Sequence, residues 1–237
     1  MDITKAQIKH FRSLSSKKYR EKYGEFIIEG EKMVKEAMDS DLDVVLSFHI
    51  DEIGYEKMKM ISLLSSPSPA IAIVKRRKDN DKIVHDYSDI ALALDSVRDP
   101  GNLGTILRLA DWFGIKQIFA STDTVELYNP KTVQASMGAI FRKNIIYTDL
   151  IELASSYKEK NLPIYGTFLD GENIYTKTLN NKGLIIMGSE NNGISPALEE
   201  VVSDKLFIPG YPADVHTSES LNVAIATAIT CSEFRRR

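Results

Sequence analysis

The sequence predicts an α/β protein whose larger, C-terminal part is a parallel sheet with helices on both faces. Three observations predict it. From residue 90 onward, short apolar segments alternate with helical patterns, glycine-rich turns follow several of the apolar segments, and 237 residues are enough for two domains. Alternation of this kind is typical of a parallel sheet, because crossover helices cover both of its faces.

A smaller α/β domain is expected before this sheet. Residues 3–22 predict a basic amphipathic helix with Ile8, Phe11 and Leu14 facing inward. Short apolar runs, a second helical pattern and polar stretches follow it. Strands are expected at 25–29, 44–50 and 70–74, a helix at 31–39, a loop at 62–69 and a linker at 75–88, which places the domains at 1–88 and 89–237.

The second domain alternates more regularly and shows no internal repeat. In parallel sheets, ligands bind where the strands end and the loops turn into helices. Polar motifs follow three of the predicted strands, so they are expected to meet at this edge. Strands are expected at 90–95, 117–120, 144–147, 163–168, 184–188 and 205–208, and helices at 102–113, 130–139, 150–160, 195–202 and 220–234.

The composition excludes several classes of protein. The single cysteine, Cys231, allows no internal disulfide and no multi-cysteine zinc site, and the four histidines show no metal-ligand spacing. No apolar run approaches the ~18 residues needed to cross a membrane. The first residues contain no apolar secretory segment. A cytoplasmic protein with no metal and no membrane partner is expected.

The charge is distributed unevenly along the chain. Thirty basic and 33 acidic residues give a net charge of −3, which by itself argues against a nucleic-acid partner. Residues 1–24, however, have a local balance of +5, which leaves −8 for the remainder. Such a cluster attracts phosphate even in an acidic protein, because screening confines its field to ~8–10 Å. A solvated helix face explains the same cluster. Further basic clusters lie at 75–78 and 235–237.

The first polar motif, from Asp99 to Arg108 (DPGNLGTILR), follows the strand expected at 90–95. It predicts a glycine-rich turn and a helix on which Arg108 lies away from the buried stripe, beside Gly104 and Thr105. An arginine there can hold a phosphate through its planar fork. The spacing matches neither the GxGxxG fingerprint nor a Walker loop. Alone, the motif fits a capped helix with a surface arginine equally well.

The second polar motif, GSENNGIS from Gly188, follows the strand expected at 184–188. Its two glycines allow the loop to wrap a ligand, and Glu190 places an acid at the end of the strand. Ser195 and Pro196 are a favourable pair for starting a helix. In an equally good interpretation, Glu190 only binds backbone amides of its own turn.

The third polar motif follows the strand expected at 205–208. It opens an apolar, alanine-rich helix, which we expect to be buried, against a partner subunit. A role for Ser220 as a simple helix cap is the alternative. The residues of this motif are Ile208, Pro209, Ser220, Leu221 and Asn222.

Together, these three motifs resemble the signature of the SpoU/TrmH family of RNA 2′-O-ribose methyltransferases, within the SPOUT superfamily. The family pattern Asn-x-Gly-x-Ile-x-Arg matches residues 102–108, Gly-x-Glu-x-x-Gly matches 188–193, and Ile-Pro…Ser-Leu-Asn-Val matches 208–223. The resemblance covers about residues 88–237. Residues 10–38 are also similar to the small N-terminal RNA-binding domain of the family.

This resemblance implies a C-terminal trefoil-knot methyltransferase domain, a small N-terminal substrate-binding domain and a homodimer. It also implies S-adenosylmethionine as the cofactor and an RNA ribose 2′-hydroxyl as the methyl acceptor. Ribosomal RNA is favoured over transfer RNA, because the added N-terminal domain resembles that of the ribosomal RNA branch. The loop 209–220 is several residues longer than is usual in the family, and Gly210 stands where the family has Met.

The matching positions imply roles for individual residues. Arg108 matches the catalytic arginine of the family. Because a guanidinium pKa exceeds ~12, we expect Arg108 to bind a phosphate beside the ribose and to favour the alkoxide by its charge. Asn102 and Asn222 are expected to orient Arg108 or the ribose. Glu190 is expected to fix the position of its loop or of an arginine across the dimer. The candidate sites are catalytic Arg108, Asn102, Glu190, Ser220 and Asn222; cofactor-binding Met187, Gly188, Ile208, Pro209 and Leu221; and RNA-binding Lys9, Arg12, Lys17, Lys18 and Arg20.

Other functions remain open. They are methylation of a transfer RNA ribose, methylation of an RNA base such as guanosine N1 by another knotted enzyme, and RNA binding without catalysis. Cytosine-C5 methylation is disfavoured, because it needs a thiolate nucleophile and Cys231 is not placed for one. A nucleotide-binding dehydrogenase is disfavoured by the glycine spacing.

Overall fold

The computed structural model describes residues 3–77, 85–212 and 220–236. The chain forms two compact units, each with its own sheet. The first comprises residues 1–81 together with Glu126–Arg142, and the second comprises Lys82–Val125 and Lys143–Arg237. The predicted domain limits, 1–88 and 89–237, remain a prediction.

The first unit is built on a three-stranded antiparallel sheet in the order β1-β3-β2. The predicted inward residues Phe11 and Leu14 are fully buried and pack with Ile71 and Ile73 of the sheet. Its strands are β1 (Glu25–Glu29), β2 (Val44–His49) and β3 (Ala70–Lys75), and its first helices are α1 (Lys5–Ser13), α2 (Lys17–Tyr23), α3 (Glu31–Met38), α4 (Ile50–Ile53) and α5 (Tyr55–Ile61).

The single helix expected at 3–22 is wrong, because α1 ends at Ser13 and α2 begins at Lys17. The hydroxyls of Ser13 and Ser15 donate to the carbonyls of His10 and Arg12 at 2.7 and 2.8 Å. Serine side chains of this kind compete with the helical backbone. The break lets Leu14 enter the core while the lysines of α2 stay in solvent.

A segment that is distant in sequence completes the first unit. It contains α7 (Pro130–Ser136) and a short 3-10 helix at Ala139–Phe141. The buried Arg20 forms an ion pair with Glu126. The guanidinium of Arg77 donates to the carbonyls of Ile140 and Phe141. Much of the basic cluster at 75–77 therefore makes contacts inside the unit.

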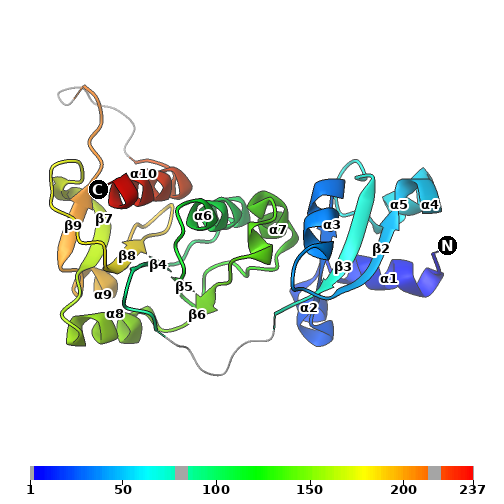
Figure 1. Cartoon of the computed structure of the whole chain (residues 1–237), viewed down its shortest axis with the longest axis horizontal. Helices are drawn as coiled ribbons and strands as arrows, with labels where there is room; N and C mark the ends of the chain where they lie inside the picture. The colour runs from blue at the N-terminus through cyan, green and yellow to red at the C-terminus, as the bar shows by residue number, and fades with distance from the viewer. Residues whose placement is uncertain (1–2, 78–84, 213–219, 237) are drawn as a thin grey trace. The chain divides into compact units, whose positions relative to one another are not determined.

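The second unit contains a six-stranded, entirely parallel sheet in the order β6-β5-β4-β8-β7-β9. Figure 1 shows α6 and α10 on one face of the sheet and α8 and α9 on the other. This arrangement confirms the predicted fold class. The elements are β4 (Ile90–Leu94), α6 (Pro100–Trp112), β5 (Ile118–Ala120), β6 (Ile146–Tyr147), α8 (Leu150–Glu159), β7 (Ile164–Asn173), β8 (Gly183–Met187), α9 (Pro196–Glu199), β9 (Asp204–Phe207) and α10 (Val223–Arg236).

Burial explains why the central strands are plain apolar runs. Every residue of β4 and of β8 is buried, as expected for strands covered on both faces. On one face, Leu153 and Tyr157 of α8 pack against Ile164 and Leu184 of the sheet. β7 runs past the predicted end at 168, because its register against β9 shifts between Thr167 and Glu172.

The last helix is fixed at its carboxyl end. Arg235 forms two hydrogen bonds, of 2.9 and 3.1 Å, with the carboxylate of Asp89. It also donates to the carbonyls of Phe113 and Gly114 at 2.8 and 3.3 Å. Arg236 pairs with Glu233, and Arg237 lies outside the described residues. The terminal arginines at 235 and 236 are therefore part of the folded unit.

Two absences hold for the part of the chain that the structure describes. None of its helices combines the length and apolar character that crossing a membrane requires. Nor does it contain a group of three or more histidine, cysteine, aspartate or glutamate side chains arranged to hold a metal ion.

Candidate active site

Asn102 lies at the centre of the candidate active site, in the first turn of α6. The carboxylate of Asp99 caps this helix by accepting the N–H of Asn102 at 2.8 Å. The side-chain Nδ2 of Asn102 donates to Oε1 of Glu190 at 2.7 Å, and its Oδ1 accepts Nδ2 of Asn222 at 2.9 Å. One amide therefore joins all three polar motifs.

Asn222 also caps α10. Its Oδ1 accepts the N–H groups of Ala224 and Ile225 at 2.9 and 3.3 Å. The helix begins at Val223, three residues later than expected, and Ser220 and Leu221 precede it as exposed residues. The interpretation of Ser220 as the cap is therefore wrong: Asn222 holds the start of α10 and Asn102 together.

The loop that carries Glu190 is closed on itself. Backbone hydrogen bonds of 2.9 and 3.0 Å join Ser189 and Gly193 in both directions. Gly188 is buried, and a Cβ there would overlap the backbone of Gly193 and Ile194. Glycine is therefore required at 188 for the loop to return so close to its own origin.

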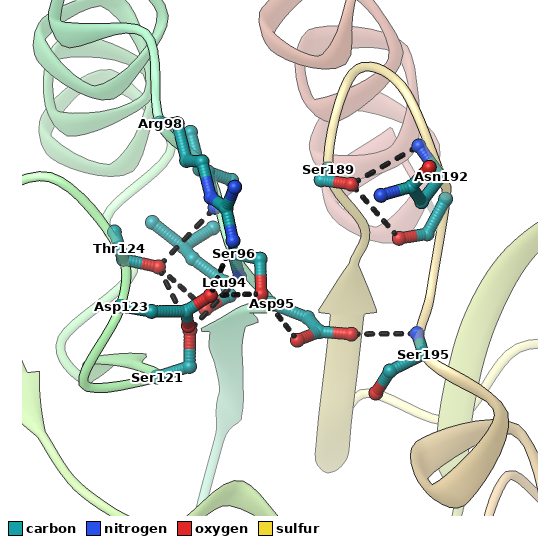
Figure 2. A network of polar contacts seen from close by, with 12 residues as sticks. Leu94, Asp95, Ser96, Arg98, Ser121, Asp123, Thr124, Ser189, Asn192 and Ser195 are labelled. Carbon is teal, nitrogen blue, oxygen red and sulfur yellow. Dashed lines mark hydrogen bonds and ion pairs between the residues drawn. The ribbon is translucent and has the colours of Figure 1, made fainter.

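Asp95 ties this loop to the end of β4, and it was not among the predicted site residues. Its side chain is buried, and Oδ2 accepts the N–H of Ser195 at 2.7 Å. Figure 2 shows this contact beside the turn formed by Ser189 and Asn192. A signal for it was present in the sequence, because an acid ends the strand expected at 90–95.

A polar network continues from Asp95 to the loop after β5 (Figure 2). Ser96 and Ser121 donate to the carboxylate of Asp123 at 2.8 and 2.7 Å, and Arg98 pairs with it at 3.1 Å. The hydrogen bonds from Ser121 and Ser96, with the Arg98 bond, lower the pKa of Asp123 to about 2, against a smaller opposing effect of burial. The carboxylate therefore stays ionised at neutral pH and neutralises Arg98.

Arg108 lies on the exposed face of α6. Within the described residues its guanidinium makes no hydrogen bond and no ion pair, so it is available to a ligand. The amides of Asn102 and Asn222 contact each other and Glu190 rather than Arg108. The expectation that these amides orient Arg108 therefore has no support in the described contacts.

The residues expected to hold the cofactor follow the ends of two strands and precede α10. Met187 and Gly188 are buried at the end of β8, Ile208 and Pro209 are partly exposed after β9, and Leu221 is exposed. Because the sheet is parallel, both strand ends lie at one edge, where Asn102 also fixes the start of α10. The closed loop at Gly188 and these apolar residues fit an adenosine ligand held largely by backbone groups.

Cys231 is not available as a nucleophile. Its side chain is fully buried in α10, and burial raises the pKa of the thiol to about 12, although the nearby Arg235 lowers it slightly. Catalysis through a covalent thiolate intermediate needs the ionised form. This finding supports the argument against cytosine-C5 chemistry.

The substitution Asn102→Asp isolates one contact of the site. The new carboxylate still accepts the hydrogen bond from Asn222, but it adds a second negative charge against Glu190. Two adjacent carboxylates repel each other, and this repulsion pushes the Glu190 loop away from α6. We expect the affinity for S-adenosylmethionine, the cofactor that the family resemblance implies, to fall about tenfold.

Calorimetry with S-adenosylmethionine measures this effect. Asn191→Asp is the matched control, because it adds the same charge to an exposed position of the same loop. An equal loss of affinity in Asn191→Asp would show that repulsion from Glu190 is not the cause.

A parallel sheet with a polar site at its carboxyl edge defines an α/β protein that binds its ligand where the strands end. Residues 89–232 match the SpoU rRNA methylase family, and residues 5–73 match the MRM3-like substrate binding domain. The chain belongs to the SpoU rRNA methylase family, which confirms the resemblance of its motifs.

Individual relatives cover nearly the whole chain. It is 27% identical to the 23S rRNA (guanosine(2553)-2′-O)-methyltransferase RlmP of Bacillus subtilis, over 97% of this chain and 96% of that protein. A TrmH-family structure from Porphyromonas gingivalis is 35% identical, with a TM-score of 0.86 over 99% of this chain and 98% of that one. The AdoMet-bound rRNA methyltransferase of Sinorhizobium meliloti is 27% identical, with a TM-score of 0.86 over 100% and 97%.

Proposed function

We propose that this protein transfers a methyl group from S-adenosylmethionine to a ribose 2′-hydroxyl of ribosomal RNA. The observation that carries the proposal is the contact of Asn102 with both Glu190 and Asn222, which joins the three family motifs at the carboxyl edge of the sheet. Membership of the SpoU rRNA methylase family supports it, as does the likeness to RlmP over nearly the full length.

The cofactor is assigned to the edge formed by the ends of β8 and β9 and the start of α10. When bound, it supplies a methyl group on a positively charged sulfur. The protein's own part is to hold the adenosine against backbone groups and apolar side chains and to fix the loop that begins at Gly188. We place the trefoil knot of the family here, in the domain assigned to 89–237. The cofactor-binding residues are Met187, Gly188, Ile208, Pro209 and Leu221.

Arg108 is assigned to the RNA rather than to the cofactor. A ribose hydroxyl is a poor nucleophile until it loses its proton, and a guanidinium beside it favours the alkoxide. The exposed fork of Arg108 binds the adjacent phosphate and so places the hydroxyl for an in-line reaction. Asn102, Glu190 and Asn222 fix the surrounding loops, and the exposed Ser220 contacts the ribose.

The test uses purified protein, labelled S-adenosylmethionine and total RNA from a strain that lacks the gene. We expect label in ribosomal RNA, at a nucleotide whose 3′ bond resists alkali because its 2′-oxygen is methylated. Label in transfer RNA would redirect the substrate assignment, and label on a base would replace the ribose assignment. Cofactor binding without transfer to any RNA would indicate a non-catalytic RNA-binding protein.

The N-terminal domain, placed at 1–88, is assigned to RNA binding. Lys9, Arg12, Lys17 and Lys18 are exposed on α1 and α2, as a phosphate-binding face requires. Arg20 does not belong to this face: it is 3% exposed, donates to the carbonyl of Leu14 and pairs with Glu126. We therefore withdraw Arg20 from the RNA-binding set.

Charge reversal tests this face. The double variant Lys17→Glu, Lys18→Glu should weaken RNA binding at least about tenfold and flatten its salt dependence, because each lost phosphate contact removes about 0.7–0.9 from the logarithmic slope. Binding measured across a salt series shows both effects. The double variant Lys35→Glu, Lys59→Glu, on the exposed sides of α3 and α5, is the control for total charge. An unchanged slope in the first variant would identify its lysines as an ordinary solvated face.

A homodimer is proposed through α6 and α10. These helices lie side by side (Figure 1) and expose Trp112 to 85% and Ile225 to 51%. Apolar side chains of this size gather at protein interfaces. A second copy of the chain is the occupant that the family resemblance favours. The assembly is placed in the cytoplasm, with its RNA.

Light scattering measures the assembly directly. We expect a dimer for the natural protein and a monomer for the double variant Trp112→Asp, Ile225→Asp, because a charge in an apolar interface opposes association. Trp112 is the single tryptophan, so in the natural protein its emission should also shift to the red when dilution dissociates the dimer. Leu169→Asp, at a position 70% exposed on β7, is the control. A dimer that survives the double variant would place the interface elsewhere.

A further inference from the structure

Two tyrosines form an exposed aromatic surface on α2 of the first unit. Tyr19 and Tyr23 lie one helical turn apart, with ring centroids 6.1 Å apart and planes that differ by only 13°. Their exposed fractions are 37% and 38%. The two nearly parallel rings stack on each other, and more than a third of each residue's surface stays in solvent.

Lysines accompany both rings. Nζ of Lys18 lies 5.9 Å from the ring centroid of Tyr19, and Nζ of Lys22 lies 5.3 Å from that of Tyr23. Since side chains four residues apart lie in a row along a helix, a row of two lysines runs beside the row of two tyrosines. The acid of α2, Glu21, makes an ion pair with Lys17 at 3.7 Å, so no acid of this helix pairs with Lys18 or Lys22, whose ammonium groups lie over the tyrosine rings.

The ring of Tyr23 is held from inside the unit. The imidazole of His10 lies against it, with centroids 4.7 Å apart and planes at 78°. Nε2 of His10 is 2.6 Å from Oε2 of the buried Glu25, whose Oε1 accepts Nζ of Lys75 at 2.6 Å. This chain of contacts restricts the ring before any ligand binds, which lowers the entropy cost of binding.

We propose that Tyr19 and Tyr23 form a stacking platform for unpaired bases of the RNA, with Lys18 and Lys22 contacting the adjacent phosphates. Every base has a flat face that stacks on an aromatic ring, and phosphates carry the charge that the lysines bind. In an RNA duplex the base faces are already covered. The inference rests on the proposed function and narrows its substrate, because the N-terminal unit then selects a single-stranded region.

Fluorescence anisotropy of the full-length protein tests the platform. The probes are a labelled RNA strand of about 12 nucleotides and the duplex of the same sequence. The double variant Tyr19→Ala, Tyr23→Ala should bind the single strand at least about fivefold more weakly at every salt concentration, with an unchanged salt slope. The pair Lys18→Ala, Lys22→Ala should instead flatten the slope by about 0.7 for each lost contact. Duplex affinity should change little in the tyrosine variant.

Matched variants separate stacking from other effects. Tyr19→Phe with Tyr23→Phe keeps both rings and should bind like the natural protein, whereas Tyr19→Leu with Tyr23→Leu keeps the apolar volume and should be as weak as the alanine pair. Tyr55→Ala removes a tyrosine that is 53% exposed on α5 and should have no effect. The platform is disproved if the alanine and leucine pairs bind the single strand as tightly as Tyr55→Ala does. It is also disproved if these pairs lose as much affinity for the duplex as for the single strand.

The outcome for the natural protein distinguishes this inference from the function on which it rests. If the natural protein methylates ribosomal RNA while the leucine pair binds the single strand normally, the platform fails and the proposed function stands. If the natural protein neither binds nor methylates RNA, the proposed function fails and the platform fails with it.

Discussion

Replacement of Arg108 by alanine is expected to lower the rate of methyl transfer at least about 100-fold and to leave the affinity for S-adenosylmethionine within about twofold of its natural value. The reason is that, at the carboxyl edge of the sheet, Arg108 is assigned to the RNA and other residues are assigned to the cofactor. Arg108 is exposed on α6 and makes no hydrogen bond or ion pair with the described residues assigned to the cofactor, so its loss should remove charge beside the ribose without disturbing the loop at Gly188. Single-turnover kinetics and calorimetry measure the two quantities.

Two further arginine variants sharpen this result. Arg108→Lys keeps the charge but loses the planar fork, so a rate that stays close to that of the alanine variant would indicate that bidentate phosphate binding matters most. Arg98→Ala is the control, because Arg98 is also exposed at this end of the sheet but is already neutralised by Asp123. A loss of cofactor affinity that equals the loss of rate in Arg108→Ala would contradict the assignment of this residue to the RNA.

Gly188→Ala is expected to abolish measurable cofactor binding. The new methyl group would overlap the backbone of Gly193 and Ile194, and backbone atoms have no alternative rotamer to adopt. The loop must therefore open, which breaks the hydrogen bonds between Ser189 and Gly193 and displaces Glu190 from Asn102. Calorimetry should show at least about a 100-fold loss, and the unfolding temperature should fall by several degrees, as about 1–3 kcal/mol of overpacking implies.

Gly193→Ala provides the comparison within the same loop. Gly193 has a φ of +67°, but a Cβ at this position meets nothing within 4 Å. Only the backbone strain of about 1–2 kcal/mol therefore applies, and cofactor binding should be weakened rather than lost. Normal cofactor binding by Gly188→Ala would show that the closed shape of the loop is not needed.

The larger unit was well predicted because its strands are apolar on both faces. β4 and β8 are buried at every position, so their residues form continuous runs that polar turns interrupt. The first unit was predicted less well. The helix expected at 3–22 is interrupted where serine hydroxyls bond to the backbone, and α4 and α5, which lie within 50–61, show no pattern strong enough to predict.

The candidate site, too, was predicted only in part from the sequence. Resemblance to the family identified Asn102, Glu190 and Asn222, but their mutual contacts join residues 88 and 120 positions apart, which no local pattern encodes. Arg20 shows the opposite error. In the sequence it looks like its lysine neighbours, but it is buried because Glu126, 106 positions away, provides a counter-charge. Local charge patterns do not contain that information.

The two fixed ends of α10 explain how this chain tolerates its unusual spacing between Pro209 and Ser220. Asn222 connects the start of the helix to Asn102 by a hydrogen bond, and Arg235 connects its end to Asp89 in the same way. The position of the helix is therefore set by contacts with α6 and with the start of β4, and not by the length of the chain that leads into it. The contacts that join Asn102, Glu190 and Asn222 should therefore keep their geometry when the number of residues between Pro209 and Ser220 changes.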